Sequence, residues 1–338
     1  MHRREFLKTA LVTATALAGA RATALAQSAG NPGASYPDRL VTLVVPFSAG
    51  SMTDILARSV ADKLSERWKK SVIVENRPGL AGTAGVAKAP ADGYTLMLSE
   101  SSSFAIWPSM HVAGTRYSPL EDFTWIAPVC TAPMVLIVSP DFPAKTLPEA
   151  LGVLRSPRSE ELSYSSSGAG SIPHIGAELL RSTLGESSKS RHIPYRGGAP
   201  AVLSVGKGET AWGVASLGSA AGLMAGGMVR PLAVTSPNRF PTFPDVPTFA
   251  EAGMPEMELN IYYLLHGPAG MPPAIVEKLN SACAAGLKQP ALREKFQVAG
   301  MQAWEDVNTP EATRKIVEQE LKRFKLVSDR TGIKISGG

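Results

Sequence analysis

Short apolar runs alternate along the chain with segments whose apolar residues recur every three or four positions. The first run is Leu40–Val45, and behind it Ile55, Leu56, Val60 and Leu64 have helical spacing. Further strands are predicted at Val72–Glu75, Thr95–Leu98 and Val135–Val138. This alternation is typical of an α/β protein with largely parallel sheets.

The same alternation begins again near Leu162–Tyr164. A helix is predicted at about residues 173 to 184, and strands follow at His192–Tyr195, Ala211–Val214 and Leu232–Thr235. The four prolines of Pro237–Pro247 predict an irregular connection. Beyond it come the apolar run Ile261–His266 and two amphipathic helices, near residues 275–287 and 312–324. The pattern predicts two α/β lobes, each with its own strand–loop–helix corner.

The first corner is the loop PFSAGSMTD at residues 46–54. A loop that leaves the carboxyl end of a parallel strand and enters a helix presents several backbone N–H groups, and the helix dipole adds partial positive charge. Such a corner attracts anions, and Gly50 lets the backbone approach a ligand closely. Thr53 or Asp54 is predicted to cap the helix. A plain strand-to-helix turn is an equally good interpretation of this loop alone.

The second corner is the loop at residues 164–174, in which Gly168 and Gly170 free the backbone and Pro173 suits the first turn of a helix. A dinucleotide-binding loop is disfavoured, because Pro173 occupies the third glycine position of G-x-G-x-x-G. Ser101, Ser102 and Ser103 offer hydroxyl donors after a third strand.

Catalytic motifs are weak in this sequence. It contains no G-x-S-x-G, H-E-x-x-H or Walker A pattern, and its histidines have no metal-ligand spacing. His174 is expected to hold its loop by hydrogen bonding rather than to transfer protons. Glu100 could touch a cationic group of a ligand, but we expect it to be solvated. Trp107, Trp125 and Trp212 are expected in the core. We therefore predict neither a catalytic residue nor a metal or cofactor.

The N-terminus has the features of an export signal. It has a basic start with Arg3 and Arg4, a weakly apolar centre and the small-residue sequence Ala24-Leu25-Ala26. The arginine pair resembles the twin-arginine signal. We expect residues 1–26 to be removed after Ala26 and the mature protein to be periplasmic. The same signal suggests the alternative function, a periplasmic oxidoreductase or hydrolase.

Charge and cysteine content restrict the function further. Without the four basic residues and Glu5 of the signal, 30 basic and 28 acidic residues remain, a net charge of +2. This balance gives no electrostatic reason to expect nucleic acid as a partner. The remaining 312 or so residues are enough for two domains. Cys130 and Cys283 are too few for a disulfide scaffold, and either a bridge or two buried thiols is compatible with the sequence.

Many ordered motifs resemble the Bug-type (TctC-like) periplasmic solute receptors of tripartite tricarboxylate transporters. The matching segments run through nearly the whole mature chain: Tyr36-Pro37, Val44–Phe47 with Gly50, Thr53 and Asp54, Val74–Gly79, Asp92–Leu96, Lys145–Leu147, Gly168 with Gly170, Ser171 and His174, Pro194–Gly197, Pro231–Thr235, Pro244–Thr248 and Glu251–Gly253.

The resemblance implies a two-lobed periplasmic binding protein of the type II-like, Venus-flytrap kind, with its ligand cleft between the lobes. It places residues 27–130 and 251–338 in lobe 1 and residues 131–250 in lobe 2. It also implies a small organic acid as ligand (a dicarboxylate, an amino acid or an aromatic carboxylate), a monomer without enzymatic activity, and membrane permease subunits or a sensor as partners.

Carried over by position, the ligand-binding residues are Phe47, Ser48, Ala49, Gly50, Ser51, Thr53, Asp54, Ser101, Ser102, Ser167, Gly168, Ala169, Ser171 and Ser216. The chain departs from the family pattern at Met52, which is expected to reshape the pocket. It also carries Ser216–Ser219 where the family commonly has an Asp-Asn pair.

Overall fold

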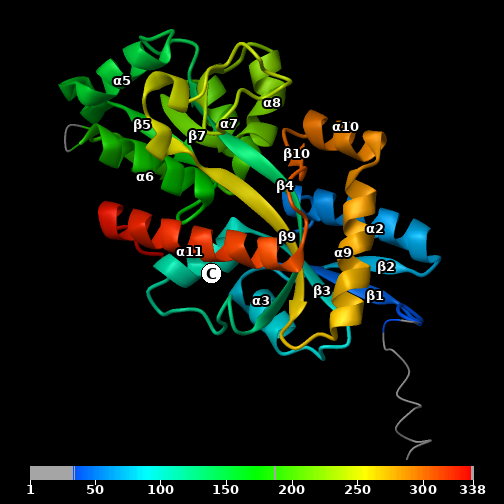
Figure 1. Cartoon of the computed structure of the whole chain (residues 1–338). Coiled ribbons are helices and arrows are strands. Elements are labelled where there is room, and N and C mark those ends of the chain that lie inside the picture. Colours follow the sequence, from blue (N-terminus) through cyan, green and yellow to red (C-terminus); the bar gives the residue numbers. More distant parts are fainter. Residues whose placement is uncertain (1–32, 34, 186–187, 336–338) are drawn as a thin grey trace, which may run out of the picture.

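The protein folds around one mixed sheet that runs through two lobes (Figure 1). The computed structural model describes residues 33, 35–185 and 188–335. The strand order is β2-β1-β3-β9-β4-β7-β5-β6, and β8 and β10 both pair with β4. The predicted signal peptide, residues 1–26, lies outside the described residues.

The strands and helices follow the order expected of an α/β protein. The strands are β1 (Val41–Val45), β2 (Val72–Asn76), β3 (Thr95–Glu100), β4 (Phe123–Val138), β5 (Ser163–Ser166), β6 (Arg191–Pro194), β7 (Trp212–Ser216), β8 (Arg230–Val234), β9 (Asn260–Pro268) and β10 (Gln302–Ala303). The α-helices are α2 (Met52–Trp68), α3 (Leu80–Ala87), α4 (Trp107–Met110), α5 (Leu147–Arg155), α6 (Ile172–Leu184), α7 (Gly198–Gly206), α8 (Leu217–Ala225), α9 (Pro273–Leu287), α10 (Pro290–Val298) and α11 (Pro310–Thr331).

The sheet is mixed rather than largely parallel. The strands of the predicted corners do pair in parallel, β1 with β2 and β3, and β5 with β6 and β7. The strands between these groups, β4 and β9, run antiparallel to each other, and they pair antiparallel with β7 and β3 respectively. The two long central strands therefore lie between two parallel α/β units and join them into one sheet.

Strand β4 spans both parts of the sheet. Its first part, from Phe123 to Pro133, pairs with β9, and its second part, from Met134 to Val138, pairs with β7 and β8. The apolar pattern predicted only the end of this strand. Pro128 cannot donate a ladder hydrogen bond, and the register shifts between Trp125 and Ala127 and between Pro128 and Cys130 break the alternation that a strand pattern requires.

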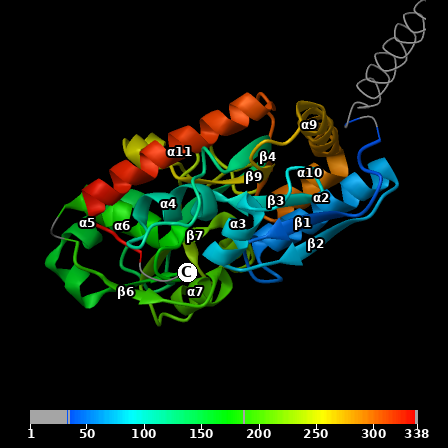
Figure 2. The same ribbon diagram turned by 90° about the horizontal axis from the view of Figure 1, so that it is seen from below.

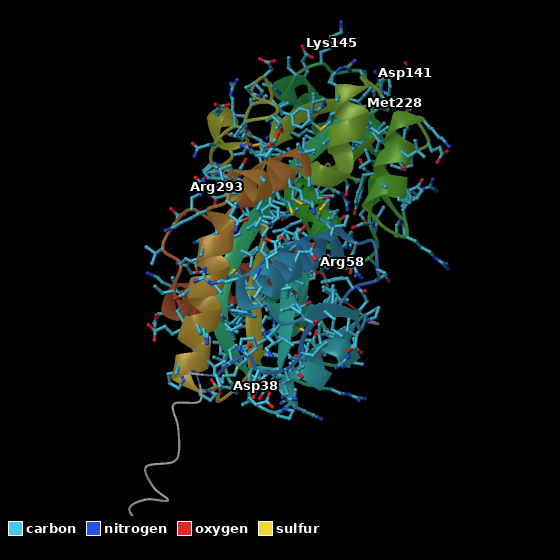
Figure 3. All side chains as sticks on the ribbon, turned by 90° about the vertical axis from the view of Figure 1, so that its right-hand side faces the viewer. Asp38, Arg58, Asp141, Lys145, Met228 and Arg293 are labelled. Atoms are coloured by element: carbon cyan, nitrogen blue, oxygen red, sulfur yellow. The ribbon has the colours of Figure 1, made fainter. Side chains whose placement is uncertain are left out.

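Helix α11 packs across the boundary between the two parts. It contacts β4 and α4 as well as α6, and Figure 2 shows it running along one side of the molecule. The chain after α11 contacts the segment after α4, where the N–H of Val112 donates to the carbonyl oxygen of Ile335 at 2.9 Å. Figure 3 places Lys145 and Asp141 at one end of the molecule and Asp38 at the other.

Two hydrophobic cores stabilise the fold. The larger is continuous from α2 and β1 through β4 and α11, and the smaller lies among β4, α7, α8 and β8. Trp125 and Trp212 are buried as predicted, whereas Trp107 is half-buried and packs against Phe47, with ring centroids 6.0 Å apart. Cys130 and Cys283 are both free and buried.

Helices rich in glycine and alanine were absent from the sequence prediction, most clearly α3 with the sequence LAGTAGVA. Glycine disfavours helix, and this segment shows little amphipathic pattern, so tertiary packing decides its conformation. Gly82 packs so closely on Arg77 that an added Cβ atom would lie 1.8 Å from the Arg77 carbonyl oxygen. In the described part of the chain, no helix combines the length and the apolar character needed to cross a membrane.

Candidate functional site: an interlobe cleft

A cleft of about 630 Å³ opens where the two parallel corners face each other across β4 and β9. Its walls come from α2 and its preceding loop on one side, and from the starts of α6, α7 and α8 on the other. The lining residues are Phe47, Gly50, Ser51, Met52, Thr53, Ile55, Glu100, Ser102, Ser167, Ser171, Ile172, Pro173, Gly197, Gly198, Ala199, Pro200, Ser216, Gly218, Ser219, Ile261 and Tyr263.

The first corner is built around the start of α2. Gly50 has a φ of 81°, a left-handed conformation that favours glycine. Ser51 is the N-cap, and its hydroxyl accepts the N–H of Asp54 at 3.2 Å. The prediction that Thr53 or Asp54 caps the helix is therefore wrong. The helix begins earlier than the apolar spacing indicated, because Ser51 already has extended backbone angles and a side chain that reaches the third helical N–H.

Asp54 fixes this corner from behind instead. Its carboxylate accepts the Gly50 N–H at 2.9 Å, binds Arg58 at 2.9 and 3.1 Å, and accepts from the side chain of Asn76 at 3.0 Å. Burial by itself raises the pKa of Asp54, but the hydrogen bonds from Arg58, Gly50 and Asn76 outweigh it and lower the pKa. Asp54 is an ionised anchor of the loop and is not among the residues that line the cleft.

The second corner is built around the start of α6. Ser171 is its N-cap and accepts the N–H of His174 at 3.3 Å, and the Ser171 hydroxyl donates to the Gly168 carbonyl oxygen at 2.7 Å. The Gly170 N–H donates to Nδ1 of His174 at 3.0 Å. This bond confirms the prediction that His174 holds its loop.

His174 belongs to a stacked pair of imidazoles behind the loop. Its ring lies 4.1 Å from the ring of His192, which hydrogen-bonds the Ser166 hydroxyl at 2.7 Å. Burial lowers the pKa of His174, and burial together with His174 lowers the pKa of His192 to about 4. Both rings are therefore neutral supports of the loop at neutral pH.

Two further helix N-termini open on the cleft, and sequence reasoning predicted neither helix. Gly197, with a φ of 114°, is the N-cap of α7, and Ser216 is the N-cap of α8. The Ser216 hydroxyl donates to Ser219 at 2.7 Å. The glycine pair Gly197-Gly198, which follows the strand at residues 191–194, was the sequence signal from which the start of α7 could have been predicted.

Glu100 lies at the end of β3, directly opposite Tyr263 on β9. Both line the cleft, together with Ile261. Glu100 is only 8% exposed, so the prediction that it is solvated is wrong. The reason is tertiary: β9 pairs with β3 and closes the edge of the sheet that would otherwise face water. Burial raises the pKa of Glu100 to about 7, although the Ser102 N–H, which donates to Oε2 at 3.1 Å, acts in the opposite direction.

The structure brings eight of the predicted ligand-binding residues to the cleft wall: Phe47, Gly50, Ser51, Thr53, Ser102, Ser167, Ser171 and Ser216. The other six are close in sequence but not among the lining residues: Ser48, Ala49, Asp54, Ser101, Gly168 and Ala169. Ser101 is fully buried and accepts the Tyr262 N–H at 3.0 Å, so its hydroxyl holds β9 in place. Met52 and Gly218 both line the cleft, and a Cβ atom added to Gly218 would lie 3.0 Å from the Met52 methyl group.

The cleft has the chemistry of an anion site that is built from helix N-termini. The N-caps of α2, α6, α7 and α8 all line it, and the first turn of each helix presents N–H groups that lack an intrahelical acceptor. Among the described residues that line it, none is Lys, Arg or His. Within residues 33, 35–185 and 188–335, no group of three or more His, Cys, Asp and Glu side chains could hold a metal ion.

Comparison with known proteins agrees with this architecture. Residues 56–333 match the family described as tripartite tricarboxylate transporter family receptor. Protein BugT of Bordetella pertussis is 33% identical over 305 residues, which are 89% of this chain and 92% of BugT. A UPF0065 protein of the same organism is 32% identical over 88% of this chain and 91% of its own length.

Solved structures give the same result. The R. palustris protein Rpa4515, solved with adipate, is 33% identical and superposes with a TM-score of 0.79 over 88% of this chain and 99% of its own. The periplasmic binding protein BugD is 31% identical, with a TM-score of 0.77 over 89% of this chain and 100% of its own. The predicted two-lobed binding-protein fold and the predicted receptor function are thereby confirmed, and the alternative of an oxidoreductase or hydrolase has no support among these relatives. The chain belongs to the tripartite tricarboxylate transporter family receptors, a family of periplasmic solute-binding proteins.

Proposed function

We propose that this receptor captures a small organic carboxylate in the cleft, chiefly through backbone N–H groups and hydroxyls at the four helix N-termini. One observation carries the proposal: the N-caps Ser51, Ser171, Gly197 and Ser216 meet around a single cavity of about 630 Å³. Helix N-termini stabilise negative charge without a cationic side chain. Relatives solved with adipate and with malate support a carboxylate as ligand.

The two lobes close on the ligand by bending along the strands that join them. The change of partner along β4, from β9 up to Pro133 to β7 and β8 from Met134, supports a first crossing near residue 131. The chain returns between β8, which ends at Val234, and β9, which begins at Asn260, and this supports a second crossing near residue 250. Residues 27–130 and 251–338 then form lobe 1, and residues 131–250 form lobe 2.

Export places the receptor where it meets its ligand. Residues 1–26 direct the chain to the periplasm, and the monomeric closed form then presents the ligand to membrane permease subunits or to a sensor. The family description, a receptor of a tripartite transporter, supports a permease as the partner. The working residues donate hydrogen bonds and perform no reaction, so the protein needs no catalytic group or cofactor.

A charge introduced at one helix N-terminus tests the proposal. Ala199 is the second residue of α7, lines the cleft and is exposed. Ala199→Asp places a carboxylate where the ligand carboxylate is expected, so affinity should fall by about tenfold or more, because like charges across a binding site repel strongly. A thermal-shift screen of the unaltered protein with a panel of small carboxylates identifies a ligand. Calorimetry then measures the affinity of the unaltered protein and of the variant for that ligand. A ligand at about 100 times its Kd adds about 2.7 kcal/mol of stability.

The matched control is Ala291→Asp, the same change at the second residue of α10, which is exposed and does not line the cleft. Both variants should fold, because an acidic residue in a first helical turn is favourable. A panel without a single stabilising carboxylate, or equal affinity in Ala199→Asp and Ala291→Asp, would contradict the proposed function.

A further inference from the structure

Among the described residues that line the cleft, one carries a carboxylic acid, and this acid is buried. Glu100 and Tyr263 stand opposite each other in an antiparallel pair, so their side chains lie on the same face of the sheet, and both line the cavity. Ile261, two residues before Tyr263, lines it as well. Glu100 therefore stands beside an apolar and an aromatic side chain, while the helix N-termini occupy the walls.

No cationic side chain balances the charge of Glu100, since none of the described residues that line the cleft is Lys, Arg or His. The hydrogen bonds that favour its ionised form both come from Ser102. Asp54, by contrast, has a counter-ion, because its carboxylate forms an ion pair with Arg58 behind the first corner. A buried carboxylate without a counter-charge is costly unless a partner arrives from outside.

Burial disfavours the ionised form of Glu100, but the hydrogen bonds from Ser102 and the helix N-termini around the cleft favour it. The Ser102 N–H donates to Oε2, and four helix N-termini bring partial positive charge into the same cavity. An ionised Glu100 repels the second carboxylate of a dicarboxylic acid and attracts a cation. A ligand that satisfies both parts of the cleft carries a carboxylate for the helix N-termini and a protonated nitrogen for Glu100.

We propose that Glu100 binds the protonated nitrogen of the ligand, so that this receptor selects amino carboxylates over dicarboxylates and amine-free acids. The inference rests on the proposed function, since it assumes that the carboxylate is held by the helix N-termini. It assigns Glu100 as a specificity-determining residue.

The first experiment compares ligands that differ only at one end. 4-Aminobutyrate, pentanoate and glutarate share one carboxylate and three methylene groups and end in an ammonium, a methyl and a second carboxylate. Glutamate and 2-hydroxyglutarate form a second series. Calorimetry at pH 8 should give the amino-bearing member of at least one series an affinity about tenfold or more above its counterparts. Glu100→Gln should remove that preference, because an amide carries no charge.

The matched control is Glu320→Gln, which changes another buried glutamate that lies on α11 and does not line the cleft. It should keep the preference. Circular dichroism and the thermal midpoint establish that Glu100→Gln is folded, so a lost preference cannot be confused with a lost fold.

The dependence on pH provides a second measurement. A group with a pKa of about 7 is mostly ionised at pH 8 and mostly protonated at pH 6, so binding of the amino carboxylate should weaken about tenfold over that range. Tyr263 on β9 faces Glu100 and Cys130 on β4 lies close to Tyr263, but burial raises both pKa values and neither group ionises there. Asp54 titrates lower. Glu100→Gln should therefore show the weaker pH dependence, and Glu320→Gln that of the unaltered protein.

The outcomes separate this inference from the proposed function. If dicarboxylates bind tightest, and more tightly at pH 6 than at pH 8, Glu100 acts as a protonated donor and only the inference is overturned. An amine preference that survives in Glu100→Gln overturns it too. If no carboxylate of either series or of the wider panel binds, the proposed function fails and the inference fails with it.

Discussion

Glu320, like Glu100, is a buried glutamate, and its burial makes the stability of the protein depend on pH. It is 3% exposed on α11, its Oε1 lies 3.4 Å from Arg323, and its Oε2 has no hydrogen-bond partner within the described residues. Burial raises the pKa of Glu320 to about 7, against the opposing effect of Arg323. The folded state therefore holds a proton that the unfolded state releases near pH 4.5, and stability falls as the pH rises from there to about 7.

Glu320→Gln should remove this penalty. The variant is expected to be more stable than the unaltered protein at pH 8, by about 1–3 kcal/mol, and equal to it near pH 4.5, since one pKa unit corresponds to about 1.4 kcal/mol. Thermal or urea unfolding at both pH values measures the difference. Glu318→Gln on the exposed side of the same helix is the control and should change stability by less than about 0.5 kcal/mol at either pH. An equal gain at both pH values would show that ionisation of Glu320 is not the cause.

At the scale of elements, the start of α2 combines helix capping with cleft geometry. Ser51 caps the helix, and Asp54 ties the Gly50 N–H, Arg58 and Asn76 together with a side chain that is only 4% exposed. These bonds hold the Gly50 turn in the conformation that lines the cleft. Because its folded pKa is lowered, Asp54 adds stability above its unfolded pKa, and this stability is lost as the pH falls through the folded value.

Asp54→Ala should therefore destabilise the protein by roughly 2–3 kcal/mol at pH 7, because several hydrogen bonds to a buried charged group are lost and their partners are left behind. Urea unfolding gives the change in the free energy of unfolding. Asp62→Ala, an exposed position on the same helix, should change it by less than about 0.5 kcal/mol. A loss in Asp54→Ala no larger than that in Asp62→Ala would show that the bonds of Asp54 do not anchor this corner.

At the scale of the whole molecule, two glycines make close contacts with distant segments. A Cβ atom added to Gly218 at the start of α8 would lie 2.3 Å from the carbonyl oxygen of Ala299, beyond the end of α10. A Cβ atom added to Gly170 would lie 2.8 Å from the side chain of Ile335. Both contacts join the two proposed lobes, so the described conformation is one in which the lobes touch.

Gly218→Ala should open this arrangement. A methyl group cannot fit against the Ala299 carbonyl, so the closed form is expected to lose about 1–3 kcal/mol and ligand affinity about tenfold. Small-angle scattering with saturating ligand should give a larger radius of gyration than for the unaltered protein. The control is Gly222→Ala on the same helix, where an added Cβ atom meets nothing within 4 Å. Unchanged affinity and scattering in Gly218→Ala would refute a role of this contact in closure.

The sequence by itself determined the local architecture of this protein. The apolar runs predicted β1, β9 and the parallel corners, because buried strands and amphipathic helices leave periodic patterns that depend only on neighbouring residues. The glycine-rich and serine-rich loops at residues 46–54 and 164–174 were recognisable for the same reason. Motifs spread over the chain also carried the family resemblance, since ordered matches over hundreds of residues do not require knowledge of any contact.

Only the tertiary structure decided how these parts form one site. The first half of β4 was hidden because Pro128 and the register shifts interrupt the alternation, and its strand conformation depends on β9, more than a hundred residues away in sequence. The third and fourth helix N-termini of the cleft, and the burial of Glu100, likewise follow from long-range pairing. Local patterns record which face of an element is apolar. Which partner covers that face, and which polar groups meet across a cleft, depends on contacts between distant segments that periodicity does not encode.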